Sequence, residues 1–435
     1  MSNPYRPERS RRLASPLTLD DLIADLVWPK LLKVGPLAIR PARLGLALVF
    51  LIGARLIIAL SDWLDWRPGE NVLGEFARTA LALLRSLRPL EAHHAANELV
   101  MLMVGLPAQL LRDSWQTALI SIPLLLIWTV IFGGAIARSA ACDFCAGVSI
   151  PWPQALGFGL TRWRSLLGAV LLPLLLVWVI VLGMAAAGWA LFSLPWLNVL
   201  GGVLWGLFLI GGLVCAGVSI AYALGHSLLV PSVAVEGTDA IDAVQHAYSF
   251  VFARPLRLVI YLVILAVQFL VVGTIVALMV WLLVQFAHDS ASAWSGPRGK
   301  MVISGLPTPP PSSPPTDAPQ SGSPIAGAPM PTRLAHGLVT TWTLVPILLG
   351  FSFAVSYYWS AMVVLYLAMR RITDGQDVQE LWMPGMVEGT LARAAAPAGA
   401  ASAPLPPFAA ASATEPKSPP GKGEGVIDNG PADET

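Results

Sequence analysis

Six long apolar runs, separated by polar segments, dominate the pattern of hydrophobic and polar positions along the chain. An apolar run of about 20 residues is long enough for a helix to cross the hydrocarbon core of a bilayer. The pattern therefore predicts an all-α polytopic membrane protein with about six transmembrane helices. The expected spans are residues 44–62, 115–137, 166–190, 199–224, 258–286 and 338–369. The fifth exceeds the required length, so we expect it to tilt or protrude, and Pro346 is expected to kink the sixth.

The stretch between spans four and five, residues 226–257, has the periodicity of a short amphipathic helix. Pro231 is expected to end the preceding span, because its ring removes an amide hydrogen. Thr238 is a favourable N-cap for the next helix, and Arg254 with its following proline ends the pattern. The expected apolar face consists of Ile241, Val244, Tyr248 and Val251. We interpret this segment as an elbow helix in the membrane interface, with the structural residues Pro231, Glu236, Gly237, Thr238 and Arg254.

Two other segments, residues 18–49 and 151–176, repeat the same order of amphipathic helix, basic residues and span. Three elbow units are therefore expected, although too few residues are identical to establish a duplication. Helical spacing also predicts a helix over residues 73–87, which is either a second interfacial helix or one packed over the bundle. The apolar stretch at 97–111 is too short to span, so we expect it to be interfacial or re-entrant.

Low-complexity segments mark the borders of the predicted transmembrane domain, residues 17–390. Residues 1–16 are rich in arginine and proline, residues 295–333 in proline, serine and glycine, and residues 391–435 in alanine and proline before an acidic end. Such compositions bury too little apolar surface to fold, so we expect disorder in all three. Residues 62–114 are expected to form an external helical loop.

Composition supports a membrane protein, because charged residues make up only 12% of the chain, against about 25% in soluble domains.

Three cysteines argue against a disulfide framework. Cys142 and Cys145 form a single CxxC without the second pair that a zinc site needs, and without the setting of a thioredoxin-like fold. The first 40 residues lack the short apolar core of a cleavable signal peptide.

The distribution of basic residues predicts the orientation. With both termini in the cytoplasm, 18 of the 27 lysines and arginines lie on the cytoplasmic side, eight lie outside, and Arg55 lies within the first span. Cytoplasmic loops carry the excess of such residues. We therefore expect a multi-pass protein of the bacterial inner membrane with both termini cytoplasmic.

Arg55 is the main candidate for a functional polar residue, because a guanidinium at the centre of a span costs at least about 2.5–3.5 kcal/mol. Its expected partners include Gln268 of span five, and the two residues define a candidate polar cavity for an anionic head group. The alternative is that Arg55 snorkels toward the end of its span.

No reaction centre is predicted from the sequence. His93 and His94 are adjacent, so on a helix they point about 100° apart and chelate a metal poorly. No HExxH, GxSxG or pair of intramembrane aspartates occurs. We expect no catalytic residues, no metal, no cofactor and no nucleic-acid binding. Glu236 is expected to cap a helix or to pair with a cytoplasmic arginine, and the alternative is that it fixes the elbow by binding Arg254 or Arg257.

A GxxxG motif at Gly202 and Gly206 lies in the fourth expected span. This spacing lets two helices approach closely. We expect it to form a packing face within the bundle, and the alternative is a dimer contact.

The segment VPSVAVEGTDAIDAVQHAYSFVFARPLR resembles the elbow of the glycerophosphoryl-diester-phosphodiesterase membrane domain. The shared features are Pro231, the apolar run 233–235, Glu236-Gly237 and the amphipathic helix that follows. The resemblance implies a membrane-embedded scaffold only, since no segment matches the soluble catalytic barrel of those enzymes. The segments VWPKLLKVGPLAIRPARLGLALVF, GGAIARSAA and YYWSAMVVLYLAMRRITDGQDVQELW look like a group of uncharacterised multi-pass proteins from planctomycete-type bacteria, over most of residues 17–385.

These observations favour a scaffold or accessory subunit without a catalytic centre, whose partners are membrane lipids and proteins of unknown identity. The alternative is a transporter or a lipid-handling carrier for an anionic head group. An intramembrane enzyme is the weakest interpretation.

Overall fold

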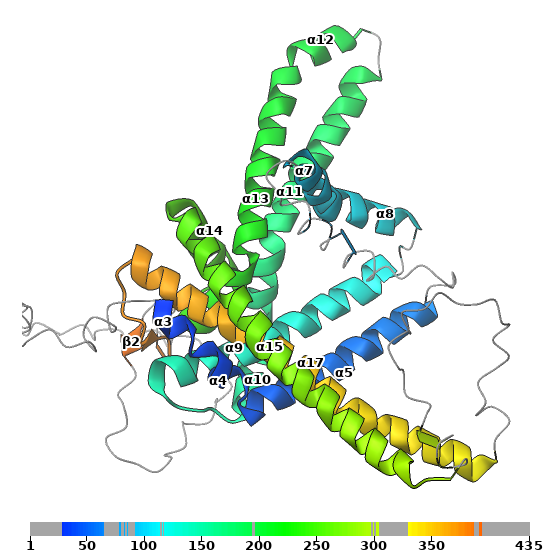
Figure 1. Ribbon diagram of the computed structural model, residues 1–435. Coiled ribbons are helices and arrows are strands. Elements are labelled where there is room, and N and C mark those ends of the chain that lie inside the picture. Colours follow the sequence, from blue (N-terminus) through cyan, green and yellow to red (C-terminus); the bar gives the residue numbers. More distant parts are fainter. Residues whose placement is uncertain are drawn as a thin grey trace, which may run out of the picture. The chain divides into compact units, whose positions relative to one another are not determined.

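The computed structural model describes residues 28–64, 92–113, 117–193, 196–296, 329–386 and 391–393, together with residues 78–79, 82, 85, 115, 299 and 302–303. Within these residues the protein is all-α, and six helices are long and apolar enough to cross a membrane. They are α5 (Pro41–Leu64), α9 (Ile122–Ala146), α11 (Trp163–Phe192), α13 (Trp205–Glu236), α15 (Pro255–Ala293) and α17 (Met330–Thr373), shown in Figure 1. The predicted fold class is confirmed.

Shorter elements connect the six long helices. They are α3 (Trp28–Leu31), α4 (Val34–Ala38), α7 (Ala92–Val100), α8 (Leu106–Asp113), α10 (Trp152–Thr161), α12 (Asn198–Val203), α14 (Ala240–Ala253) and the π-helical turns η2 (Met101–Gly105) and η3 (Thr117–Ser121). Strands β1 (Glu380–Leu381) and β2 (Ala392–Arg393) pair antiparallel, with Glu380 opposite Arg393. The predictions for residues 1–27, for 304–328, for 394–435 and for most of 73–87 lie outside the described residues.

The expected helix end at Pro231 is wrong, because α13 continues through this residue to Glu236. A proline inside a helix removes one backbone hydrogen bond at a cost of about 3 kcal/mol or more. Here every residue from Ser227 to Glu236 is buried, and α13 packs against α9, α14 and α17. Tertiary packing of this last part of the helix offsets the local cost.

Helices α15 and α17 are much longer than a bilayer requires. They contain 39 and 44 residues, which corresponds to lengths of about 59 and 66 Å at 1.5 Å per residue. The hydrocarbon core is only about 30 Å thick. Both helices therefore extend well beyond it, and α17 includes Pro346 without interruption.

Helix α9 has the largest number of neighbours among the long helices, since it contacts α5, α11, α13 and α17 as well as α10. The contact with α10 is very close at Gly159, where any side chain would overlap the carbonyl oxygen of Ile131. The long helices also pack pairwise, α11 with α13 and α15 with α17, and Figure 1 shows both pairs side by side.

The buried core lies at one end of the long helices. Its members come from α3, α4, α10 and α14, from the first turns of α5, α11 and α15, from the second half of α9, and from the last turns of α13 and α17. In contrast, only 6% of the most apolar window of α13 and of α15 is buried. The core is thus formed where α5, α11 and α15 begin and where α9, α13 and α17 end.

Helix α14 presents a different face from the one expected. Ala243, Ala247, Phe250 and Val251 are buried, whereas Ile241 is 67% exposed. The small alanines let α14 approach α13 and α11, because short side chains permit close contact between helix backbones. The prediction is therefore correct for Val251, partly correct for Val244 and Tyr248, which are half-buried against the core, and wrong for Ile241.

Two further expectations concern packing. Residues 92–113 form α7, η2 and α8 in direct succession, and the indole nitrogen of Trp178 on α11 donates a hydrogen bond to the carbonyl oxygen of Met103 at 3.1 Å.

A side chain added at Gly202 or Gly206 would meet open space. The predicted packing role of this GxxxG motif is therefore wrong within the described residues.

Candidate functional site

A network of buried charges occupies the core at the common end of the long helices. Arginine is almost never fully buried unless its charge is paired. Yet Arg43 and Arg370 have no exposed surface, and Arg138 is 2% exposed. Each of the three arginines joins segments that are far apart in the sequence.

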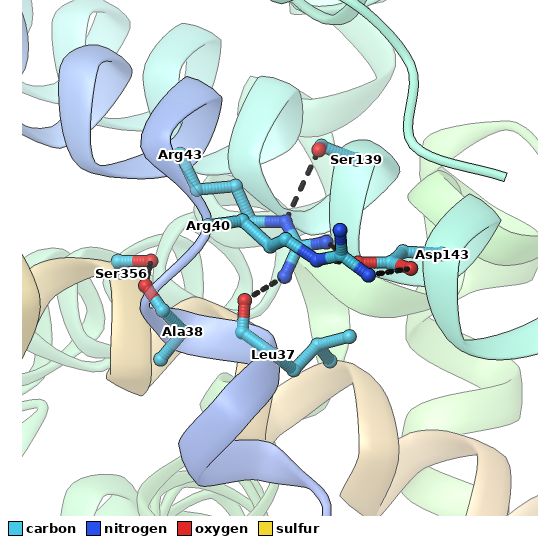
Figure 2. Close-up of polar contacts among 7 residues, drawn as sticks. All are labelled: Leu37, Ala38, Arg40, Arg43, Ser139, Asp143 and Ser356. Carbon is cyan, nitrogen blue, oxygen red and sulfur yellow. Dashed lines mark hydrogen bonds and ion pairs between the residues drawn. The ribbon is translucent and has the colours of Figure 1, made fainter. Parts of the chain in front are cut away.

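Arg43, in the first turn of α5, is paired with Asp143 in the last turn of α9 (Figure 2). Its guanidinium also donates to the hydroxyl of Ser139 at 3.1 Å and to the carbonyl oxygen of Leu37. Arg40 adds a second cation 3.3 Å from the same carboxylate. Ser356 of α17 donates to the carbonyl oxygen of Ala38 at 2.7 Å. These contacts fasten the start of α5 to α9 and α17.

Arg138 of α9 connects α13 to the segment after α17. Its guanidinium donates to the carbonyl oxygens of Ala234 at 2.9 Å and of Trp382 at 2.7 Å. The same cation lies 5.3 Å from the ring centre of Phe158 and 5.7 Å from that of Trp382. Arg162 covers the Trp382 ring as well, at 5.0 Å. Cation–π contacts of this kind strengthen when water is excluded.

Glu236, the last residue of α13, contacts three side chains from two other helices, two of them at hydrogen-bond distance. His246 of α14 lies 2.8 Å away through its Nδ1 atom, the hydroxyl of Tyr366 donates to the other carboxylate oxygen, and Nη1 of Arg370 is 3.8 Å distant. Arg370 also donates to the carbonyl oxygens of Asp377 and Glu380. The expected pairing of Glu236 with Arg254 or Arg257 is wrong, since both arginines are exposed.

Gly237 allows the chain to turn from α13 into α14. Its φ of +63° favours glycine, and its amide donates to the carbonyl oxygen of Val233. A side chain here would overlap the ring of Trp382, whose own amide donates to the carbonyl oxygen of Val235 at 2.9 Å. The Glu236-Gly237 pair therefore fixes both a charge contact and a turn.

Three ionisable groups outside the long helices have shifted pKa values. The hydrogen bond to Glu236 raises the pKa of His246, against the opposing effect of its partial burial. Burial raises the pKa of Asp374, which lies just after α17 and faces the same histidine. Burial also raises the pKa of Tyr248 on α14. His246 is thus the group of the network that changes charge nearest neutral pH.

The remaining predicted residues lie apart from this network. Arg55 is exposed on α5. Gln268 donates to the carbonyl oxygen of Leu32 at 2.8 Å and accepts from the hydroxyl of Tyr357 at 3.2 Å. The shared polar cavity of Arg55 and Gln268 stays a prediction.

Of two further elbow residues, Thr238 has another role than expected and Arg254 lies where it was expected. Thr238 is not the N-cap of α14, which begins after Asp239. The Thr238 hydroxyl is instead buried, without a hydrogen-bond partner among the described residues. Arg254 lies between α14 and α15, as expected for the end of the amphipathic pattern.

No group of three or more histidine, cysteine, aspartate or glutamate side chains that could hold a metal occurs in the described part of the chain. Cys142 and Cys145 are buried free thiols on either side of Asp143. The CxxC therefore lies within the helix that carries the Asp143 ion pair, and its two thiols form part of the core.

Sequence reasoning missed the most important members of the network: Arg43, Arg138, Asp143, Tyr366, Arg370 and Trp382. In the sequence the three arginines contribute only to the uneven distribution of basic residues that predicts the orientation. A signal was present, since Arg138 and Asp143 lie within a run of small residues, IARSAACDFC. Small residues next to charges allow close helix packing, which buries the charges.

The chain matches no protein-family model, and no curated protein or solved structure is significantly similar to it.

Proposed function

We propose that this protein is a membrane scaffold or accessory subunit of the bacterial inner membrane, with both termini in the cytoplasm. The observation that supports it most directly is the location of the core. The helix ends are fixed to one another by buried charges, whereas only 6% of the most apolar window of α13 and of α15 is buried. Exposed span surfaces are available to lipids and to the helices of other membrane proteins.

The charge network supports the same proposal. Arg43, Arg138 and Glu236 make their hydrogen bonds to side chains and carbonyl groups of this chain. Because these three side chains are buried and make hydrogen bonds within the chain, they suit a role in holding the helices in place. No reaction is assigned to them under this proposal. The alternative, a carrier for an anionic head group, rests on Arg55 and its exposed place on α5.

Photo-crosslinking in living cells tests the scaffold. A photoreactive residue is placed at Leu213 of α13 or at Leu270 of α15, which are 73% and 68% exposed. Leu265, 2% exposed on the same helix α15, is the matched control position. We expect discrete protein adducts from Leu213 and Leu270 that the control position lacks. Adducts with lipid alone at both exposed positions would contradict a scaffold and favour a carrier.

A further inference from the structure

Two glycines mark a common level on the paired helices α11 and α13. The Sγ atom of Cys215 on α13 lies 4.0 Å from the carbonyl oxygen of Val177 on α11. The two helices run in opposite directions, so moving toward the core means moving forward along α13 and backward along α11. Gly225 lies ten residues after Cys215, and Gly168 lies nine residues before Val177. These two glycines are therefore at about the same level.

Helix α14 meets this level at both of its ends. A Cβ added at Gly168 would lie only 2.8 Å from the Cβ of Ala240, in the first turn of α14. A Cβ added at Gly225 would lie only 2.9 Å from the side chain of Val251, in its last turn. Because both ends of α14 are at one level of the pair, α14 lies across α11 and α13.

The level of α14 is that of a membrane surface. From Trp205 to Gly225, α13 rises by about 31 Å at 1.5 Å per residue, and the hydrocarbon core of a bilayer is about 30 Å thick. Beyond this point every residue from Ser227 to Glu236 is buried. Gly225 therefore marks the place where α13 passes from its span into the core, and α14 lies where hydrocarbon gives way to head groups.

The joint between α14 and α15 presents two cations and two apolar side chains at this level. Phe252 and Leu256 are 69% and 77% exposed, and Arg254 and Arg257 are exposed as well. Neither arginine makes a hydrogen bond or an ion pair through its side chain with any residue that the structure describes. In this they differ from the buried arginines of the charge network, whose partners all belong to the chain.

We propose that the α14–α15 joint binds the head group of an anionic phospholipid. Guanidinium groups bind phosphate oxygens through paired N–H donors, and two neighbouring cations favour a lipid with a net negative charge. The exposed side chains of Phe252 and Leu256 contact the adjoining acyl chains, which a soluble phosphate or an acidic peptide lacks. This inference goes beyond the scaffold proposal, since the site needs no protein partner and can be tested without one.

The test is native mass spectrometry of the full-length, delipidated protein in detergent. It is titrated with palmitoyl-oleoyl phosphatidylglycerol, which is anionic, and with the zwitterionic phosphatidylcholine of the same acyl chains. Arg254→Gln/Arg257→Gln removes both cations of the joint. Arg112→Gln/Arg333→Gln is the matched control, because it removes the same charge from two exposed arginines on α8 and at the start of α17.

The wild type and the control are expected to bind phosphatidylglycerol equally, and more tightly than phosphatidylcholine. Arg254→Gln/Arg257→Gln is expected to weaken phosphatidylglycerol binding about 30-fold, since each basic residue at a membrane surface contributes about fivefold. Binding of phosphatidylcholine is expected to stay unchanged. A loss no larger than that of the control would overturn the proposal. If the double variant does not fold, Arg257→Gln decides, and an unchanged affinity in this variant also overturns it.

A second pair of substitutions distinguishes a lipid from a soluble anion. Phe252→Ser/Leu256→Ser retains both arginines, and both replaced side chains are exposed, so the melting temperature of the wild type is expected. Binding of phosphatidylglycerol is expected to weaken several-fold, because the contact with the acyl chains is lost. Unchanged binding would show that only the charge is recognised, and would overturn the assignment of this surface to a lipid.

Discussion

At the scale of single residues, the protein depends on charges that are removed from water. A buried ion pair gains its stability only when both partners and their hydrogen bonds are complete. Arg43 meets this condition through Asp143, Ser139 and the carbonyl oxygen of Leu37. Loss of one partner leaves the other charge uncompensated, so these residues are more sensitive to substitution than the exposed arginines that flank the same spans.

Asp143→Asn is expected to lower the free energy of unfolding by about 3–5 kcal/mol, because Arg43 would stay buried without its counter-ion. Thermal unfolding in detergent measures this effect. Asp289→Asn is the control, since Asp289 is exposed and its carboxylate accepts hydrogen bonds of 3.3 Å from the neutral side chain of Gln285. Similar melting temperatures for the two variants would show that the Arg43–Asp143 pair contributes little.

His246 is expected to make stability depend on pH. Its pKa is raised by Glu236, so the stabilising contact is complete below the unfolded value of about 6.5 and is lost as the pH rises through the folded value. Asp374 faces the same histidine, and burial raises the pKa of its carboxyl group. Because His246 is 44% exposed, the effect is expected to stay within about 1 kcal/mol.

Melting temperatures between about pH 6 and pH 8.5 test this dependence, a range that brackets the ordinary histidine pKa. The wild type is expected to lose stability toward the alkaline end, whereas His246→Gln and Glu236→Gln each flatten the curve. Three parallel curves would contradict a role for the histidine–glutamate contact.

At the scale of elements, the joint between α13 and α14 depends on a single glycine. Gly237 and Gly375 both have a positive φ, of +63° and +71°. They differ in surroundings, because a side chain at Gly237 overlaps Trp382 and one at Gly375 meets open space. A comparison of substitutions at the two glycines therefore separates the cost of backbone strain from the cost of the overlap with Trp382.

Gly375→Ala is expected to cost about 1–2 kcal/mol, the penalty for a left-handed conformation. Gly237→Ala is expected to cost about 1–3 kcal/mol more, since Trp382 must move. Thermal unfolding of both variants measures the difference. Equal losses would mean that Trp382 shifts without consequence.

At the scale of the whole molecule, six long helices are joined mainly at one end. This end contains the start of α5, the end of α9, and the ends of α13 and α17. The opposite ends carry exposed aromatic residues such as Trp196 and Trp294, 93% and 97% exposed. The proposed orientation places the joined end in the cytoplasm and these tryptophans on the outer side.

Labelling of single cysteines tests this orientation, in a protein whose three native cysteines are replaced by alanine. A membrane-impermeant thiol reagent added to intact cells is expected to label Trp196→Cys and Trp294→Cys, and to label Arg254→Cys only after lysis. The reverse pattern would place both termini outside.

The sequence by itself determined the number of spans and their approximate bounds, because about 20 consecutive apolar residues are a local property of the chain. It also located the turn at Gly237, since Glu236-Gly237 and the amphipathic helix after it are local signals. The tertiary structure alone decided where α13 ends and which face of α14 is buried, because packing outweighs the cost of Pro231 and the exposure of Ile241. It alone paired Arg43 with Asp143 and Glu236 with His246 and Arg370. A basic residue at a span end has the same sequence signature whether it faces lipid head groups or a carboxylate from a distant helix, and only the fold distinguishes the two.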